Sequence, residues 1–202
     1  MDPSTATRLA LELEFRVAHD GSLSPRIPQT VFPPRLAVYQ HGLTYSVFHR
    51  HPTPPEVRSA LDRLSAEQMF LDPAAVGQLL DEEGKFSPPE RGVTYEVQRR
   101  PDPREHAEAV RQSHFHIVLR DGRPVAWAWS IRGDVHAEEG TVETVPEFRR
   151  RGYGRQALAA WAHDIVGSGK RAFFRDRGIT PASESLARSL GATAIDRFIR
   201  YP

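Results

Sequence analysis

The stretch that decides the fold is Val145-Pro146-Glu147-Phe148-Arg149-Arg150-Arg151-Gly152-Tyr153-Gly154-Arg155. It follows a run of β-forming residues, 141–145, and precedes apolar residues at helical spacing, which are Leu158, Trp161, Ala162 and Ile165. This pattern predicts a strand that ends at Pro146, a turn through arginines and two glycines, and a helix over residues 152–166. The helix is therefore expected to begin at the carboxyl end of the strand.

A helix that starts in this way presents unpaired backbone N–H groups and the positive end of its dipole, which suit a phosphate anion. Gly152 and Gly154 remove side chains where a diphosphate would approach the backbone, and Arg150, Arg151 and Arg155 add charge at the rim. The spacing matches neither the dinucleotide fingerprint nor the phosphate loop of nucleotide hydrolases. The alternative is an ordinary strand-to-helix loop with a solvated basic run.

The hexapeptide 149–154 resembles the coenzyme A signature Q/R-x-x-G-x-G/A of the GCN5-related N-acetyltransferases, the GNAT family. Pro146-Glu147-Phe148 resembles the lead-in P-E-F/Y-R that is common in that family. A second patch, Thr180 to Gly191, resembles the late helix of the family and stands at the expected distance after the first. The resemblance covers roughly residues 115–202 and does not visibly extend to the first ninety or so.

The resemblance implies an α/β (α+β) fold of GNAT type, with a mixed, mostly antiparallel twisted sheet and helices on both faces. Residues 93–202 are expected to form the acetyltransferase domain, including a hairpin that turns at Asp121-Gly122. Residues 1–92 are either the diverged first strand and helices of that fold or an added element. Within them, apolar residues at every second position over 9–17 predict a strand, and Asp72-Pro73 predicts a helix start.

The resemblance also implies direct transfer of acetyl from acetyl-CoA to a primary amine of a small-molecule acceptor. The backbones of Val142, Glu143 and Thr144 are expected to contact the pantetheine arm and the acyl carbonyl. The backbone amides around the turn are expected to hold the pyrophosphate, and the cofactor-binding residues there are Arg149, Arg150, Arg151, Gly152, Tyr153, Gly154 and Arg155.

Acyl transfer needs an unprotonated amine beside the thioester carbonyl, so a carboxylate is expected to take a proton from the incoming ammonium, directly or through water. Glu138, Glu139 and Glu143 lie on or just before the strand, and the sequence does not choose among them. Ser183 is the remaining catalytic candidate, because it keeps the serine of the family's late helix. A serine at that position equally caps a helix.

The late helix departs from the family pattern at three positions. Ala187 stands where many members carry a tyrosine that protonates the leaving thiolate, Thr180 replaces an asparagine, and Ala192 replaces a phenylalanine. The general acid is therefore unassigned. The alternative function is a catalytically weak or inactive coenzyme A-binding sensor or interaction module.

Composition limits the remaining classes of function. The 27 Lys and Arg nearly cancel the 26 Asp and Glu, which argues against a nucleic-acid partner. The chain has no cysteine, so direct transfer is simpler than a covalent acyl-enzyme. No metal site is expected, because the histidine pairs His49/His51 and His114/His116 have no evident third ligand. Without a signal peptide or a long apolar run, we expect a cytoplasmic monomer or homodimer with no membrane partner.

Overall fold

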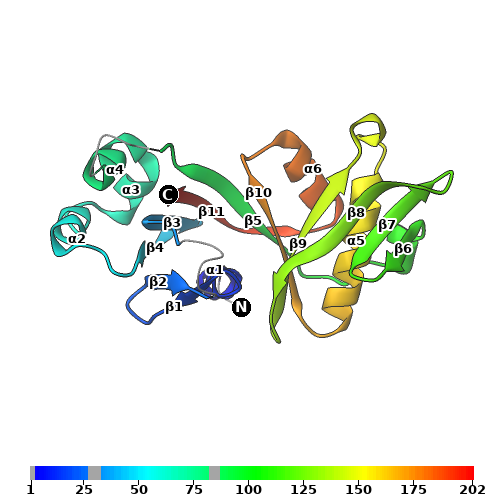
Figure 1. Ribbon diagram of the computed structural model, residues 1–202, viewed down its shortest axis with the longest axis horizontal. Coiled ribbons are helices and arrows are strands. Elements are labelled where there is room, and N and C mark those ends of the chain that lie inside the picture. The colour runs from blue at the N-terminus through cyan, green and yellow to red at the C-terminus, as the bar shows by residue number, and fades with distance from the viewer. Residues whose placement is uncertain (1–2, 27–32, 82–86) are drawn as a thin grey trace. The chain divides into compact units, whose positions relative to one another are not determined.

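The computed structural model describes residues 3–26, 33–81 and 87–202 and divides the chain into two units, whose elements are labelled in Figure 1. The first unit comprises Met1–Thr94, Arg177–Ile179 and Ile195–Pro202, and the second comprises Tyr95–Asp176 and Thr180–Ala194. In this division the C-terminal segment belongs to the first unit. That residues 93–202 form the acetyltransferase domain stays a prediction. No helix in the described ranges has the length and apolar run needed to cross a membrane.

The first unit is a mixed sheet with helices around it. Its strands are β1 (Phe15–Val17), β2 (Ser22–Pro25), β3 (Leu36–His41), β4 (Thr44–Arg50) and β11 (Thr193–Tyr201), and they run in the order β1-β2-β4-β3-β11. Only the β2 and β4 pair is parallel among these neighbours. The helices are α1 (Pro3–Glu12), α2 (Pro55–Leu61), α3 (Ala66–Leu71) and α4 (Pro73–Leu80).

The N-terminal helix α1 corrects one expectation. A strand was predicted over residues 9–17, but the chain is helical to Glu12 and only β1 is extended. The apolar residues fit both the helical and the strand spacing, and the helix is adopted because it buries Ala6, Ala10 and Leu11 on one side, together with the polar Thr7. The helix start at Asp72-Pro73 is confirmed, with the Asp72 carboxylate accepting from the Ala75 amide at 3.1 Å.

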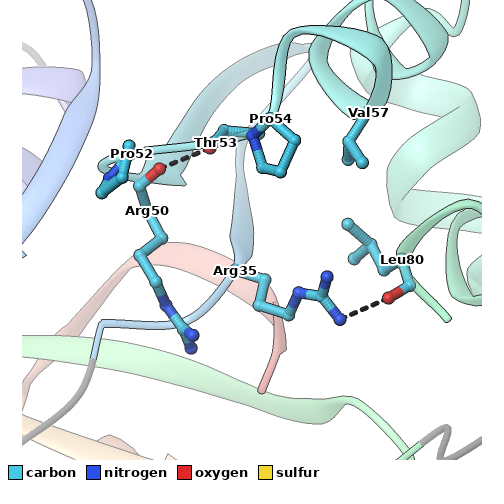
Figure 2. Close-up of a pocket in the computed structure, with 7 residues that line it drawn as sticks. All are labelled: Arg35, Arg50, Pro52, Thr53, Pro54, Val57 and Leu80. Carbon is cyan, nitrogen blue, oxygen red and sulfur yellow. Dashed lines mark hydrogen bonds between the residues drawn. The ribbon is translucent and has the colours of Figure 1, made fainter. Parts of the chain in front are cut away.

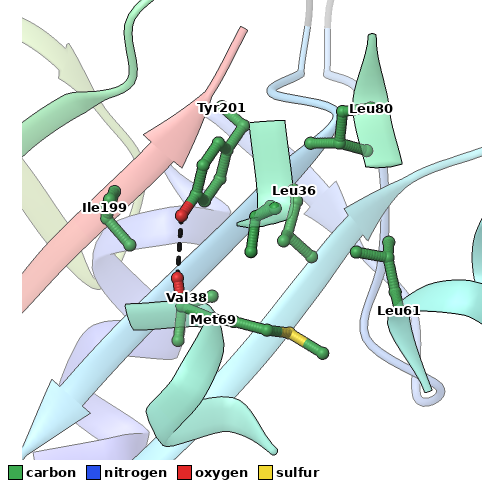
Figure 3. Packing of buried hydrophobic residues seen from close by; sticks show 8 residues of the cluster. Leu36, Val38, Leu61, Met69, Leu80, Ile199 and Tyr201 are labelled. Carbon is green, nitrogen blue, oxygen red and sulfur yellow. Dashed lines mark hydrogen bonds between the residues drawn. The ribbon is translucent and has the colours of Figure 1, made fainter. Parts of the chain in front are cut away.

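Strand β3 separates two apolar clusters, because its successive side chains point to opposite faces of the sheet. On one face, Leu36 and Val38 pack with residues of α2, α3 and α4, and the Tyr201 hydroxyl donates to the Met69 carbonyl at 2.7 Å (Figure 3). On the other face, Ala37 and Tyr39 pack with Leu11 of α1 and with Phe15 and Leu23 of the first two strands. Helices therefore cover both faces of this sheet, as predicted.

The second unit holds the segment that resembles the acetyltransferases. Its sheet runs in the order β10-β9-β8-β7-β6, and only β9 and β10 pair in parallel. The strands are β6 (Ala109–Gln112), β7 (Phe115–Arg120), β8 (Arg123–Gly133), β9 (Ala137–Thr144) and β10 (Arg171–Arg177), while β5 (Glu90–Val97) passes from the first unit into the second. The helices are η1 (Pro103–His106), η2 (Pro146–Phe148), α5 (Tyr153–Gly167) and α6 (Pro181–Ser189).

Helix α5 lies along β7, β8 and β9 (Figure 1). Trp161 is buried in this contact, and its indole N–H donates to the Ser130 hydroxyl at 2.8 Å. A Cβ on Gly140 would lie 2.7 Å from the Trp161 ring, so the strand needs a glycine there. Helix α5 thus packs on small residues of β8 and β9, which here are Ser130 and Gly140. The mixed, mostly antiparallel sheet is confirmed.

A pair of stacked histidines predicts how the stability of the fold depends on pH. The rings of His106 and His163 lie 4.8 Å apart, and His163 Nε2 accepts from Arg100 at 2.7 Å. Burial, and then the nearby His163, lower the pKa of His106 below the ordinary 6.5. The unfolded chain therefore binds a proton at His106 more readily than the folded chain does. The contribution of His106 to stability is fully present above about pH 6.5 and is lost as the pH falls below that value.

We therefore expect the free energy of unfolding in urea to fall between pH 7.5 and pH 5, and to fall less in His106→Gln. Burial lowers the pKa of His49 in the same direction, so part of the slope stays in that variant. The control is His114→Gln, since His114 is exposed. A slope unchanged by His106→Gln would contradict the prediction.

Candidate active site

The turn between β9 and α5 has the geometry of an anion-binding helix start. Gly152 is the N-cap of α5, with φ of 82°, and the first helical bond there runs from the Gln156 amide to the Gly152 carbonyl at 3.1 Å. The amides of Tyr153, Gly154 and Arg155 therefore precede the helical bonding pattern. Arg150 also has a positive φ, 61°, which is uncommon for a residue with a side chain. The turn is thus tight, and its donors lie at the end of β9.

Gly154 is required by the close approach of α5 to β9. A Cβ at this position would lie 2.7 Å from the Thr144 hydroxyl and 3.7 Å from the Val142 side chain. The Arg149 side chain also returns to the strand, with Nε donating to the Thr144 carbonyl at 3.3 Å. The structure therefore brings together the strand residues and the turn residues that were expected to bind one cofactor.

Two side chains of the turn are held by other parts of the second unit. Arg120 on β7 donates to the Tyr153 hydroxyl at 3.0 Å and lies 4.7 Å from the centre of its ring. Arg155 pairs with Glu105 at 2.7 Å and donates to the Ser189 carbonyl at 3.1 Å. Hydrogen bonds from the Asp102 amide and from Arg99 lower the pKa of Glu105, so its carboxylate is charged at neutral pH. The Arg155 charge is therefore offset by Glu105, whereas Arg150 and Arg151 are exposed.

A cleft of about 690 Å³ lies beside the turn. Its walls come from β8, β9, the following turn and α6, and the residues that line it are Trp127, Val142, Glu143, Thr144, Val145, Pro146, Arg149, Ala182, Ser183 and Leu186. All of them belong to the second unit. The cleft joins the strand expected to hold a pantetheine arm to the late helix.

The three candidate carboxylates lie in different surroundings. Glu138 pairs with Lys170 at 2.7 Å and accepts from the Ser130 hydroxyl. Glu139 has a buried side chain, which pairs with Arg175 at 3.2 Å. Glu143 is exposed, lies opposite Trp127 in the β8–β9 ladder, and is the one of the three that lines the cleft. Of the three, only Glu143 therefore combines an accessible carboxylate with the cleft.

Ser183 lies in the first turn of α6 and lines the cleft. Thr180 caps this helix: its hydroxyl accepts from the Ser183 amide at 3.2 Å and lies 2.8 Å from the Ser183 hydroxyl. The Thr180 amide donates to the Asp176 carboxylate at 2.6 Å. Ala187 is buried and contributes no hydroxyl at the position where the family often has tyrosine. Ser183 thus both belongs to a cap and faces the cleft.

Three other basic residues, which lie on or just before β10, are paired with carboxylates. Lys170 pairs with Glu138, as described above, and Arg171 pairs with Glu96 at 2.6 Å. Arg177 pairs with Glu90 at 3.2 Å. These residues therefore serve as partners within the fold.

One histidine of each pair considered as a metal ligand contacts another side chain instead. His116 bonds to Asp164 at 2.9 Å, and His49 lies 2.9 Å from an Arg58 nitrogen. Within ranges 3–26, 33–81 and 87–202, no three His, Cys, Asp or Glu side chains meet as a metal site would require.

Sequence reasoning did not assign Trp127, Leu186 or Asp176 to the site. Trp127 lines the cleft from β8, and Leu186 lines it from α6. Asp176 fixes the start of α6 through the Thr180 amide. The pairing of Trp127 with Glu143 across β8 and β9 is the signal that would have found the tryptophan, because facing residues share one side of a sheet.

The chain is similar to several known acetyltransferases. Over 90 residues the chain is 34% identical to mycothiol acetyltransferase from Nocardiopsis dassonvillei. The matched segment covers 45% of this chain and 27% of that protein. It is similar to the crystal structure of a GCN5-related N-acetyltransferase-like protein from Streptococcus suis, with a TM-score of 0.49 and 13% identity over 99% of this chain and 98% of that one. A GNAT-family acetyltransferase structure from Novosphingobium aromaticivorans matches with a TM-score of 0.47 and 16% identity, over 58% and 67% of the two chains.

The match to a family model is broader than the match to the curated relative. The chain spans about a quarter of that relative's length, whereas the model of the acetyltransferase (GNAT) family matches residues 78–181, just over half of this chain. The matched range contains β9, the arginine-glycine turn and all of α5. The chain belongs to the acetyltransferase (GNAT) family.

Proposed function

We propose that the protein is an acetyl-CoA-dependent N-acetyltransferase that transfers acetyl directly to a primary amine of a small molecule. The observation that carries this proposal is the continuity of the cleft with the turn: Thr144 and Arg149 belong to the cleft, and Gly154 packs on Thr144. A cofactor with its diphosphate at the start of α5 would have its acyl arm beside β9. The second unit supplies both the turn for the diphosphate and the strand for the acyl arm.

In this proposal the amides of residues 150–155 hold the pyrophosphate, and the exposed Arg150 and Arg151 add positive charge. The backbone of residues 142–144 positions the thioester. Bound acetyl-CoA supplies the activated acyl group and a thiolate leaving group. The cofactor is the acyl donor, and no metal takes part.

Glu143 is the proposed general base. Its exposed carboxylate lines the cleft, and it takes a proton from the acceptor ammonium, directly or through one water, so that the neutral amine attacks. The adjacent Trp127 offers an apolar wall against which the body of the acceptor packs. Ser183 is the proposed hydrogen-bond donor to the departing sulfur, because its hydroxyl lines the same cleft.

We expect Glu143→Gln to lower kcat for amine acetylation by about 100-fold at pH 7.5, since a positioned general base contributes factors of that order. Its affinity for acetyl-CoA should stay near that of the parent. The matched control is Glu147→Gln, which removes the same charge from an exposed position on η2. Thiol release from acetyl-CoA with a panel of amines, including the acceptor of mycothiol acetyltransferase, measures kcat, and calorimetry measures affinity. A normal kcat in Glu143→Gln would remove the base assignment.

The alternative proposal is a coenzyme A-binding sensor or interaction module. The buried Ala187 favours it, because α6 has no tyrosine hydroxyl at that position. Tight binding of acetyl-CoA without turnover of any amine would support this alternative. Turnover of one amine would exclude it. A cytoplasmic location and a monomeric or homodimeric state stay predictions.

A further inference from the structure

A second pocket lies in the first unit and has no role in the function proposed above. Its volume is about 330 Å³, and it is lined by Arg35, Arg50, Pro52, Thr53, Pro54, Val57 and Leu80. Figure 2 shows the two arginine side chains on one side of the pocket and Pro54 and Val57 on the other. The pocket thus combines two cationic groups with an apolar wall.

The two arginines face each other across neighbouring strands. Leu36 of β3 pairs with His49 of β4, and one step outward the Arg50 amide donates to the Arg35 carbonyl at 3.1 Å. The register therefore brings two cationic side chains to the wall of one pocket.

The Arg50 guanidinium uses only one of its nitrogen atoms in a hydrogen bond to the described residues. Its Nε donates to the Pro33 carbonyl at 2.7 Å, and in the part of the chain that the structure describes its two terminal amino groups have no partner. Burial, and then the charge of Arg35, lower the pKa of Arg50. Arg35 is held in place by a bond to the Leu80 carbonyl. Arg50 therefore keeps a two-pronged donor set beside a second positive charge, which is the geometry that phosphate and carboxylate groups accept.

We propose that the Arg35/Arg50 pocket binds a small molecule through a phosphate or carboxylate group, with an apolar body against Pro54 and Val57. The terminal amino groups of Arg50 donate to the oxyanion, and Arg35 adds a second positive charge beside it. The apolar wall limits the rest of the ligand to a compact group. The first unit is then a ligand-binding part of the protein, separate from the acetyl-CoA turn.

Calorimetry on the full chain, in buffer free of phosphate, tests this with three probes that share a phenyl ring: phenyl phosphate, benzoate and uncharged benzamide. We expect saturable binding of at least one of the two anions and none of benzamide, and the better anion identifies the oxyanion class. Arg50→Gln should weaken binding about tenfold or more. The matched control, Arg63→Gln, removes the same charge from an exposed residue after α2 and should change nothing.

A second variant protects the test against a folding defect in Arg50→Gln. Val57→Phe fills the pocket but keeps both arginines, and it should also abolish anion binding while leaving the urea midpoint near that of the parent. Equal affinity of the parent and both variants for the anions, or no binding of either anion, would overturn the proposal. So would a drop in acetyl-CoA affinity in Arg50→Gln, because the pocket would then belong to the cofactor site.

Discussion

Gly152→Asp should weaken acetyl-CoA binding by about 100-fold or more. The new carboxylate would stand at the N-cap of α5, where we place the pyrophosphate. Two unit charges about 4 Å apart repel by roughly 4 kcal/mol near a protein surface, so a loss of about two thirds of that amount reaches this factor. Calorimetry with acetyl-CoA measures the loss directly.

Two controls separate charge from backbone strain. Gly152→Asn has the same shape without the charge and should bind acetyl-CoA far better than Gly152→Asp. Gly169→Asp meets the same φ, 82°, and the same open surroundings at the other end of α5, so it should carry a similar strain of about 1 kcal/mol and bind normally. If Gly152→Asp binds acetyl-CoA as tightly as Gly152→Asn, the diphosphate does not lie at this turn.

The strand–turn–helix unit was predictable because its information is local. A proline, two glycines and a helical apolar stripe lie within about twenty residues, and together they determine where β9 ends and where α5 begins. The residue range 9–17 shows the limit of such reasoning. Its apolar residues fit the spacing of a helix as well as that of a strand, and packing against β3 favours the helix.

Side-chain partners far apart in the chain were not predictable. Arg155 was expected to add charge for a phosphate, but it pairs with Glu105, fifty residues away, and no sequence pattern links the two. The same holds for the arginines of the first-unit pocket, which face each other only because β3 and β4 pair in one register. Whether the turn residues bind coenzyme A stays a prediction, which Gly152→Asp tests.

The buried ion pair of Glu14 and Arg200 carries the largest effect that we expect on stability. The two residues are 186 positions apart, their side chains are almost fully buried, and Arg200 Nη1 lies 3.0 Å from the Glu14 carboxylate. Arg200 Nε also donates to the Tyr39 hydroxyl at 2.8 Å. Burial alone would lower the pKa of Arg200, but Tyr39 and Glu14 outweigh it and raise it, so the guanidinium stays charged.

Glu14→Gln should therefore lower the free energy of unfolding by about 3–5 kcal/mol, because it leaves the Arg200 charge buried without its counterion. Replacing the whole network with apolar residues, as in Glu14→Leu/Tyr39→Phe/Arg200→Met, should recover most of that loss, since no charge or hydroxyl is then stranded. Arg197→Met, an exposed position on the same strand, should change stability by less than about 0.5 kcal/mol. Urea unfolding of the four proteins measures these differences. A Glu14→Gln variant as stable as the parent would show that water reaches Arg200.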